Sequence, residues 1–149
     1  MEISRVEHNP ELIRLTRAEI AYSWGAILPF LERALEYCDG EITAEDLSIF
    51  TSQGLMDVWV ACEKEKIWAV AVTEIVQYPR TRVLRLVCLS GEDIKTWKHF
   101  DAHIERYAFL QGCKMIEGFT RPGMEKLVRE LGWRRRFVVL RKMVDTKVH

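Results

Sequence analysis

Hydrophobic and polar residues follow a strand-like pattern in the middle of the chain. Three runs rich in β-branched and aromatic residues predict strands at residues 56–63, 67–77 and 82–89. The polar pair Lys64-Glu65 separates the first two runs, and a proline-containing turn at residues 78–81 separates the second from the third. Because both connections are short, the three strands are expected to pair antiparallel as a meander.

After Leu89 the pattern changes to alternating helices and strands. A helix is expected from Ser90 to about Leu110. A strand, a second helix and a final strand are expected to follow at residues 114–120, 122–131 and 133–144. The long helix acts as a crossover, so the strand at residues 114–120 should pair in parallel with the strand at residues 82–89.

The N-terminal part of the chain carries helix signals. Asn9-Pro10-Glu11 has a capping residue, a proline suited to a first turn and a carboxylate suited to the helix dipole. The helical pattern continues to about Tyr37, and Pro29 predicts a bend near residues 23–29 that divides it into two helices. Thr43-Ala-Glu-Asp46 is close to a capping box and predicts a short helix that ends at Gly54.

Together these elements predict an α/β (α+β) fold with a mixed central sheet of about six strands flanked by helices. The length of 149 residues is that of one domain, expected to span residues 1–149. The residues expected to be mostly buried are Trp59, Val70, Val72, Leu84, Leu86, Val87, Trp97, Ile104, Leu127, Leu131, Phe137 and Val139.

Composition and charge exclude several function classes. The formal net charge is zero, so nucleic acid is not an expected partner. The longest purely apolar run, residues 67–72, is too short to cross a bilayer, and the first residues show no apolar signal segment. We therefore expect a cytoplasmic protein without a membrane partner. The four cysteines are scattered and are read as reduced thiols rather than as a disulfide frame or a zinc site.

Two further groups of residues bear on partners. His99 and His103 have the i, i+4 spacing of metal ligands, but no third ligand accompanies them, so no metal is expected and the polar face of a helix explains them. Arg134-Arg135-Arg136 is the densest basic cluster and stands against acidic stretches such as residues 41–46. Such a layout in a neutral chain favours a protein partner or self-association, with a solvated strand end as the alternative.

The order of elements over residues 56–144 resembles the GCN5-related N-acetyltransferase (GNAT) fold. The best local match is the stretch from Met124 to Trp133, which resembles the last helix of that family followed by glycine and an aromatic residue. The resemblance implies that the fourth and fifth strands separate and that coenzyme A lies in the gap between them. The chain also resembles GNAT-like proteins of tailed bacteriophages. This resemblance rests on its size, on the turn after Leu89 and on the arginine-rich ending.

The turn after the third predicted strand is where the resemblance implies the coenzyme A pyrophosphate site. The candidate cofactor-binding residues are Leu89, Ser90, Gly91, Glu92 and Asp93. The resemblance implies the motif Gln/Arg-x-x-Gly-x-Gly/Ala at this turn. Gly91 fits either the first or the last glycine of that motif, and neither alignment completes it. Glu92 and Asp93 would repel a phosphate, at about a few kcal/mol each for an effective dielectric near 20. The alternative is a helix end that caps itself, with Ser90 and Asp93 as a near capping box.

The catalytic positions of the family are only partly filled. The resemblance places a proton-donating tyrosine four residues before the glycine of the last helix, and Val128 occupies that position here. Glu74 and Glu117 are the candidates for a general base by their location on central strands, with a solvated strand carboxylate as the alternative for each. Tyr78 and Tyr107 could donate a proton, with a packed aromatic ring as the alternative.

These observations leave two functions open. The first is a GNAT-fold protein with a degenerate coenzyme A motif, used as a non-catalytic binding or structural module such as a bacteriophage virion component. It needs no cofactor and would be found in the host cytoplasm or the virion. The second is an acetyl-CoA-dependent N-acetyltransferase, in which a deprotonated amine attacks the thioester.

Overall fold

A computed structural model describes residues 10–91 and 100–147 of the chain. These residues form two compact units, Met1–Phe119 and Thr120–His149, and each unit is described by itself. The expectations for Asn9, Trp97 and His99, and for Glu92 and Asp93, lie outside the described residues. The prediction of a single domain stays a prediction.

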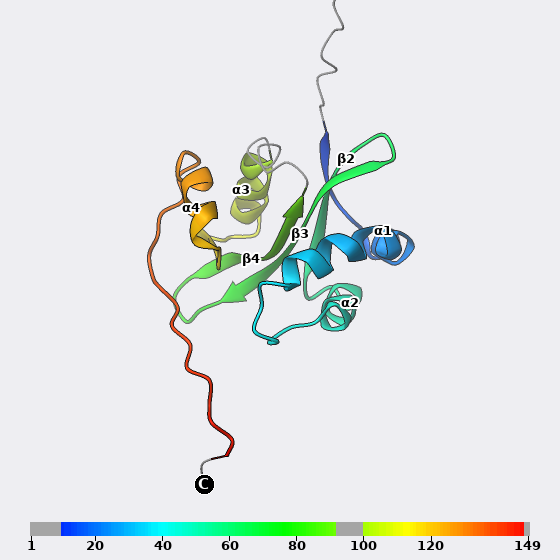
Figure 1. The fold of residues 1–149 in the computed structure, drawn as a ribbon. Helices are drawn as coiled ribbons and strands as arrows, with labels where there is room; N and C mark the ends of the chain where they lie inside the picture. The colour runs from blue at the N-terminus through cyan, green and yellow to red at the C-terminus, as the bar shows by residue number, and fades with distance from the viewer. Residues whose placement is uncertain (1–9, 92–99, 148–149) are drawn as a thin grey trace, which may run out of the picture. The chain divides into compact units, whose positions relative to one another are not determined.

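The first unit is built on one mixed sheet (Figure 1). Its five strands are β1 (Glu11–Arg14), β2 (Asp57–Glu63), β3 (Lys66–Gln77), β4 (Arg82–Gly91) and β5 (Met115–Gly118). The strands lie side by side in chain order; the first three pairings are antiparallel, and β5 pairs with β4 in parallel. The predicted mixed sheet, the meander and the parallel crossover are therefore confirmed, with five strands among the described residues where about six were expected.

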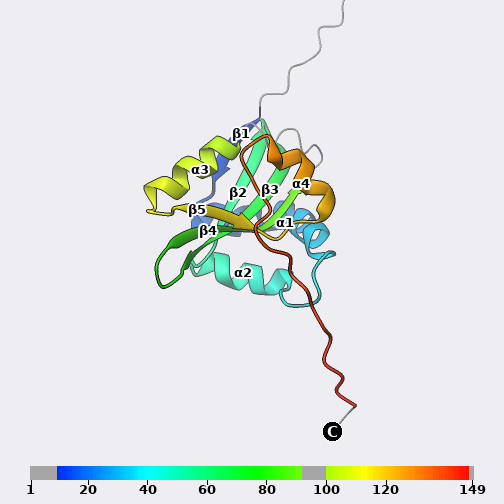
Figure 2. The ribbon, with the colours of Figure 1, turned by 90° about the vertical axis from the view of Figure 1, so that its left-hand side faces the viewer.

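Helices cover both faces of this sheet, as Figure 2 shows from the side. The helices of the first unit are α1 (Arg17–Leu35), α2 (Ala44–Ser52) and α3 (Asp101–Leu110). One buried cluster joins α1 and α2 to the face that carries Val58 and Val70, and a second joins α3 to the face that carries Trp59 and Ala71. No helix within residues 10–91 and 100–147 has the length and apolar character needed to cross a membrane.

The start of the chain differs from the expectation of a helix at residues 9–11. Residues Glu11–Arg14 form strand β1 instead, because Leu12 and Ile13 pair with β2 and are half-buried. The helix begins at Arg17, after the capping residue Thr16. The Thr16 side chain accepts a hydrogen bond from the backbone N–H of Glu19, and the Glu19 carboxylate accepts one from the backbone N–H of Thr16. This capping box satisfies two N–H groups that would otherwise lack partners, and it decides the boundary.

The predicted break at Pro29 is also wrong, because α1 continues through it as one helix. Pro29 removes one backbone hydrogen bond from the helix interior. Ile27 and Leu31, on either side of it, are 0% exposed and fix this stretch against the sheet. Their burial therefore outweighs the cost of the proline. The short helix predicted at Thr43 is confirmed as α2, including its capping box with Asp46.

The expected core is confirmed in part. Five of the predicted residues are buried, namely Trp59, Val70, Val72, Leu84 and Ile104. Four others are half-buried, namely Leu86, Val87, Leu127 and Leu131. Phe137 and Val139, at 88% and 56% exposed, contradict the prediction, and their exposure follows from the local structure of the second unit.

The second unit contains helix α4 (Pro122–Arg129) and an extended ending. The final strand predicted at residues 133–144 is not present: residues 133–145 have no regular secondary structure. A strand needs a backbone partner along its edge, and none lies beside this segment within the unit. Arg135 instead turns back onto α4, where Nε and Nη2 donate to the two carboxylate oxygens of Glu125.

Candidate functional site

The pairing of strands β4 and β5 ends halfway along β4. Their parallel pairing covers only residues 83–86 of β4 and 115–118 of β5, and its last two pairs are Arg85 with Glu117 and Leu86 with Gly118. Strand β4 then continues to Gly91 with no β5 residue beside it. The remainder of β4 thus has a backbone edge that β5 does not cover, as the resemblance implied for the cofactor gap.

A β-bulge lies where the two strands separate. Val72 of β3 pairs with Cys88, whereas the next residue, Thr73, pairs with Leu86, so Val87 is an extra residue on β4. A bulge bends its strand and increases the local twist. It therefore provides a physical reason for β4 to turn away from β5 at this point.

The predicted cofactor-binding turn is partly strand. Ser90 and Gly91 were expected to open a helix, but they belong to β4 and pair with Val70 and Ala69 of β3. Leu89 also lies in β4 and is half-buried. The expected cap at Ser90 is wrong because the ladder with β3 holds this residue in the strand. The role of these residues as cofactor ligands stays a prediction.

Gly91 has a packing reason for lacking a side chain. A Cβ atom at this position would lie 2.8 Å from Cβ of Ala69 and 3.1 Å from the carbonyl oxygen of Trp68. Carbon atoms in contact normally lie about 3.5–4.0 Å apart. The backbones of β3 and β4 therefore approach closely here only because residue 91 is a glycine.

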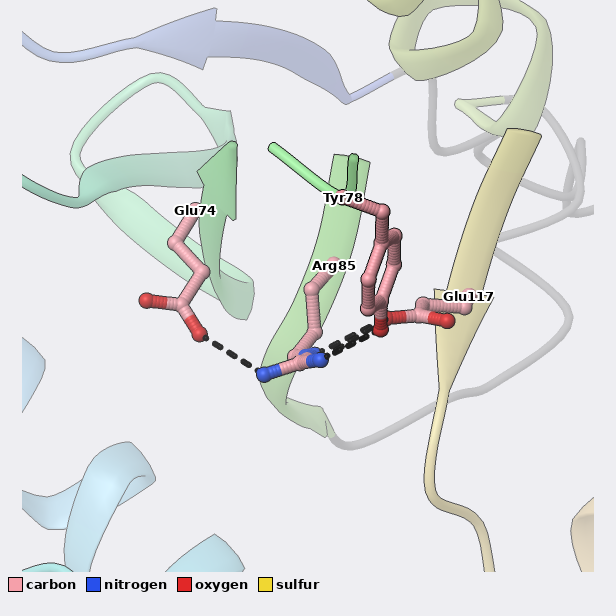
Figure 3. Close-up of polar contacts among 4 residues, drawn as sticks. All are labelled: Glu74, Tyr78, Arg85 and Glu117. Atoms are coloured by element: carbon pink, nitrogen blue, oxygen red, sulfur yellow. Dashed lines mark hydrogen bonds and ion pairs between the residues drawn. The ribbon is translucent and has the colours of Figure 1, made fainter. Parts of the chain in front are cut away.

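Four polar side chains meet, three from neighbouring strands and one from a turn, as Figure 3 shows. Arg85 of β4 lies between Glu74 of β3 and Glu117 of β5, its direct partners in the sheet. Tyr78, in the turn between β3 and β4, donates from its hydroxyl to Oε1 of Glu117 at 2.7 Å. Arg85 donates from Nη2 to the same Oε1 at 2.9 Å, and also to the Tyr78 hydroxyl at 2.9 Å. These residues, Glu74, Tyr78, Arg85 and Glu117, are called the Arg85 network below.

The two carboxylates in the Arg85 network are held unequally. Oε1 of Glu117 also accepts from Nε of Arg85 at 3.1 Å, whereas Oε1 of Glu74 lies 3.4 Å from Nη1, at the long end of a hydrogen bond. Burial by itself would lower the pKa of Arg85, but hydrogen bonds to Glu117 and Tyr78 outweigh it and raise that pKa. The guanidinium therefore stays charged and serves as the fixed centre of the network.

Both predicted general bases, Glu74 and Glu117, belong to the Arg85 network. A general base needs a free oxygen within hydrogen-bond reach of the substrate proton. Oε1 of Glu117 already accepts three hydrogen bonds, which leaves Oε2 as its only open oxygen among the described residues. The ring of Phe119 lies 5.8 Å from Arg85 Cζ and is 73% exposed, so the network borders an exposed aromatic side chain. The catalytic role of Glu74 and Glu117 stays a prediction.

Tyr107 belongs to a separate cluster between α3 and the β1–β2 edge. Its hydroxyl donates to Oδ2 of Asp57 at 3.0 Å, and Arg14 lies over its ring at 4.8 Å. The ring packs edge-on against Trp59 at 5.1 Å between centroids. Burial and the neighbouring Asp57 raise the pKa of Tyr107, so its proton is held firmly. This geometry agrees with a packed aromatic that anchors α3.

Two further features of the sequence concern metal ligands and thiols. No group of three or more potential metal ligands occurs within residues 10–91 and 100–147. All four cysteines are free, and burial raises the pKa of the Cys88 thiol to about 12. That thiol is therefore protonated at neutral pH and is a poor nucleophile. Val128 lies in α4, as expected from the resemblance.

Sequence reasoning missed Arg85. Its signal was present, because Glu74, Arg85 and Glu117 are charged residues in the interior of predicted strands. A buried or half-buried charge on a strand is favourable only when a partner of opposite charge lies across the sheet. The register that makes these three residues neighbours depends on the bulge at Val87 and the parallel pairing of β5, which the sequence pattern does not specify.

Comparison with known proteins gives no match to a family model and none to a curated protein. Solved structures do match. An aminoglycoside acetyltransferase from an uncultured soil metagenomic sample aligns with 91% of this chain and 97% of its own, at 13% identity and a TM-score of 0.68. Glucosamine-6-phosphate N-acetyltransferase from Arabidopsis thaliana aligns with 93% of this chain and 100% of its own, at 13% identity and a TM-score of 0.65.

A transcriptional regulator from Bacillus halodurans is similar to the same extent, at 15% identity and a TM-score of 0.68 over 91% of this chain. Proteins with different names thus share the architecture, and at these identities the similarity concerns the fold alone. The sheet order, the separation of β4 from β5 and the breadth of the structural matches show that this chain has the GNAT fold.

Proposed function

We propose that this chain is a GNAT-fold binding or structural module that does not catalyse acetyl transfer. The observation that carries the proposal is the packing of Gly91 against Ala69, at 2.8 Å for an added Cβ. A phosphate-binding glycine turns its bare backbone towards the ligand. Here the open position on Gly91 is directed at β3, and the glycine is explained by the sheet without any ligand.

The side chains available for catalysis support the same proposal. Val128 cannot protonate a leaving thiolate. Glu117 gives one carboxylate oxygen to Arg85 and Tyr78, and Glu74 approaches the same guanidinium. The strongest hydrogen bonds of the network therefore join its own side chains, which is the arrangement expected of a structural element.

One observation favours the alternative of an acetyl-CoA-dependent N-acetyltransferase. The strand edge at residues 87–91 is not covered by β5, so every second residue along it directs its N–H and C=O towards the gap. An extended ligand such as the pantetheine arm of acetyl-CoA could pair with these groups. This alternative would assign acetyl-CoA as the cofactor and an amine as the acceptor.

Titration calorimetry with coenzyme A distinguishes the two functions. The module predicts weak or absent binding by the wild-type chain and no release of free thiol from acetyl-CoA in the presence of amines. The matched variant is Glu92→Gln with Asp93→Gly, which removes two negative charges and should restore part of the phosphate affinity. Micromolar binding by the wild type, about −8 kcal/mol, would return acetyl transfer to first place.

The partner class follows from the same proposal. A module of this kind acts through protein partners or self-association, not through nucleic acid or a membrane, because its formal net charge is zero. Because the sequence resembles GNAT-like phage proteins, the specific candidate is a bacteriophage virion component, found in the host cytoplasm or in the virion. Mass spectrometry of purified virions from a host that carries the gene tests it: detection supports the role, and absence from the particles overturns it.

A further inference from the structure

The outer side of helix α1 is apolar where a surface helix normally carries charge. Its inner side packs on the sheet through Ile20, Ile27 and Leu31, which are buried. The side directly opposite is exposed, and between residues 18 and 29 it is formed by small or apolar residues, namely Ala18, Ala21, Tyr22, Gly25, Ala26 and Pro29. These six residues, called the α1 stripe below, recur at the spacing of one helix face. A helix that is apolar all round is normally buried in a larger structure.

Charged residues stand at both ends of the α1 stripe. Arg17 and Glu19 lie at its N-terminal end, and Glu32 and Arg33 lie at its C-terminal end, all four exposed. With 3.6 residues per turn, Arg17 and Glu32 fall on one side of the stripe, and Glu19 and Arg33 fall on the other. Each side therefore carries one cation and one anion at opposite ends of the helix. The members of each pair are about 22 Å apart along the axis, so they cannot contact each other within one chain.

The α1 stripe is complementary to an antiparallel copy of itself. Turned end to end, it places residue 18 opposite 29, residue 21 opposite 26, and residue 22 opposite 25. The bulky Tyr22 then faces a glycine, whereas a parallel pair would set Tyr22 against Tyr22. Small residues let two helices approach to the lower end of the usual 8–10 Å between axes. A two-fold axis also brings Arg17 of one copy beside Glu32 of the other, and Glu19 beside Arg33.

Pro29 adds a polar reason for the same arrangement. Because proline has no N–H, the carbonyl of Gly25 lacks the donor that a helix supplies four residues later. In the antiparallel pair, Tyr22 of the second copy lies opposite Gly25, and its hydroxyl can donate to that carbonyl. The ring of Tyr22 is 93% exposed in the single chain, and tyrosine at an interface typically buries its ring and satisfies its hydroxyl.

We propose that two copies of this chain associate through antiparallel packing of their α1 helices, with the α1 stripe as the contact and the four flanking charges as two kinds of intermolecular ion pair. The stripe and the charges all belong to one helix of the first unit. The inference names the surface through which the proposed module self-associates, and it does not depend on coenzyme A binding.

Analytical ultracentrifugation of the full chain over a wide range of concentration tests the association. The expected species has twice the mass of the 17.5 kDa chain. Ala21→Lys should weaken association tenfold or more, about 1.4 kcal/mol, because it places an unpaired ammonium group in an apolar contact. Ala102→Lys is the matched control: Ala102 is also an exposed helical alanine of the first unit, in α3, and this variant should remain dimeric.

Reversal of the flanking charges tests the orientation. Arg17→Glu and Glu32→Arg should each weaken association severalfold, and the double variant should recover most of the loss, because it restores the pair between copies with its signs exchanged. Two residues too far apart to meet within one helix can rescue each other only through a second copy. A monomer at all concentrations overturns the proposal, including one whose stripe is covered by its own second unit. A dimer that Ala21→Lys leaves intact, or a double variant without recovery, overturns it as well.

Discussion

Replacement of Gly91 with alanine is the most direct test of why the glycine is there. The added Cβ would lie 2.8 Å from Cβ of Ala69, which is closer than a normal carbon contact by about 0.7–1.2 Å. Overpacking of this kind costs about 1–3 kcal/mol.

Alanine also restricts the unfolded chain more than glycine does, which stabilises the folded state by about 0.4–1 kcal/mol. Gly91 does not have a positive φ, so no backbone strain is added. We therefore expect Gly91→Ala to lower the free energy of unfolding by about 1 kcal/mol, as measured by urea denaturation. Gly25→Ala is the matched control: Gly25 is within α1 with nothing within 4 Å of an added Cβ, so alanine should stabilise by up to about 1 kcal/mol.

A double-mutant cycle with Ala69→Gly isolates the contact. Removing the Ala69 methyl group relieves the shortest approach but leaves the Trp68 carbonyl oxygen at 3.1 Å, so the rescue should be partial. The two changes should then cost less together than the sum of their separate effects, by about 0.5–1 kcal/mol. An unchanged or raised stability of Gly91→Ala, combined with loss of coenzyme A affinity, would refute the packing argument and assign the glycine to a ligand.

Three further predictions concern other parts of the first unit. Thr43→Ala should lower the free energy of unfolding by about 1 kcal/mol in a denaturant titration, because it removes the capping box that Thr43 forms with Asp46; an unchanged midpoint would contradict this. Tyr107 has a raised pKa in the folded chain, so its hydrogen bond to Asp57 stabilises the fold fully below the unfolded pKa, which is near 10. The difference in unfolding free energy between wild type and Tyr107→Phe should therefore shrink as pH rises through the folded pKa. A difference that stays constant in alkali would count against this prediction. Cys88, buried and with a pKa of about 12, should not react with an aromatic disulfide reagent at neutral pH until the chain unfolds, as followed by absorbance.

The sequence predicts the elements whose signals are local. The turn at Lys64 and the alternation on either side of it predict the β2–β3 hairpin, and the structure places Lys64 at a φ of 56° as a tight turn requires. Thr43 and Asp46 likewise predict α2 from within one turn of helix. In each case neighbouring residues satisfy the backbone, so no distant contact is needed to determine the element.

The sequence prediction fails where two local signals compete or where a distant partner decides. Pro10 and Glu11 carry helix-start features, but pairing of Leu12 with β2 and the stronger cap at Thr16 determine a strand followed by a helix. The candidate site depends still more on tertiary structure. Glu117 is 32 residues from Arg85 along the chain, and only the parallel pairing of β5 makes them neighbours.

The Arg85 network has a consequence for how this sequence can change over evolutionary time. Loss of Arg85 alone would leave the carboxylates of Glu74 and Glu117 on the two strands that flank β4 with no arginine between them. Loss of Glu117 alone would remove the main partner of the guanidinium and of the Tyr78 hydroxyl. Replacement of all three charged residues by apolar ones would cost little. Substitutions at these positions should therefore be inherited as a set, so that related sequences carry either the whole network or none of it.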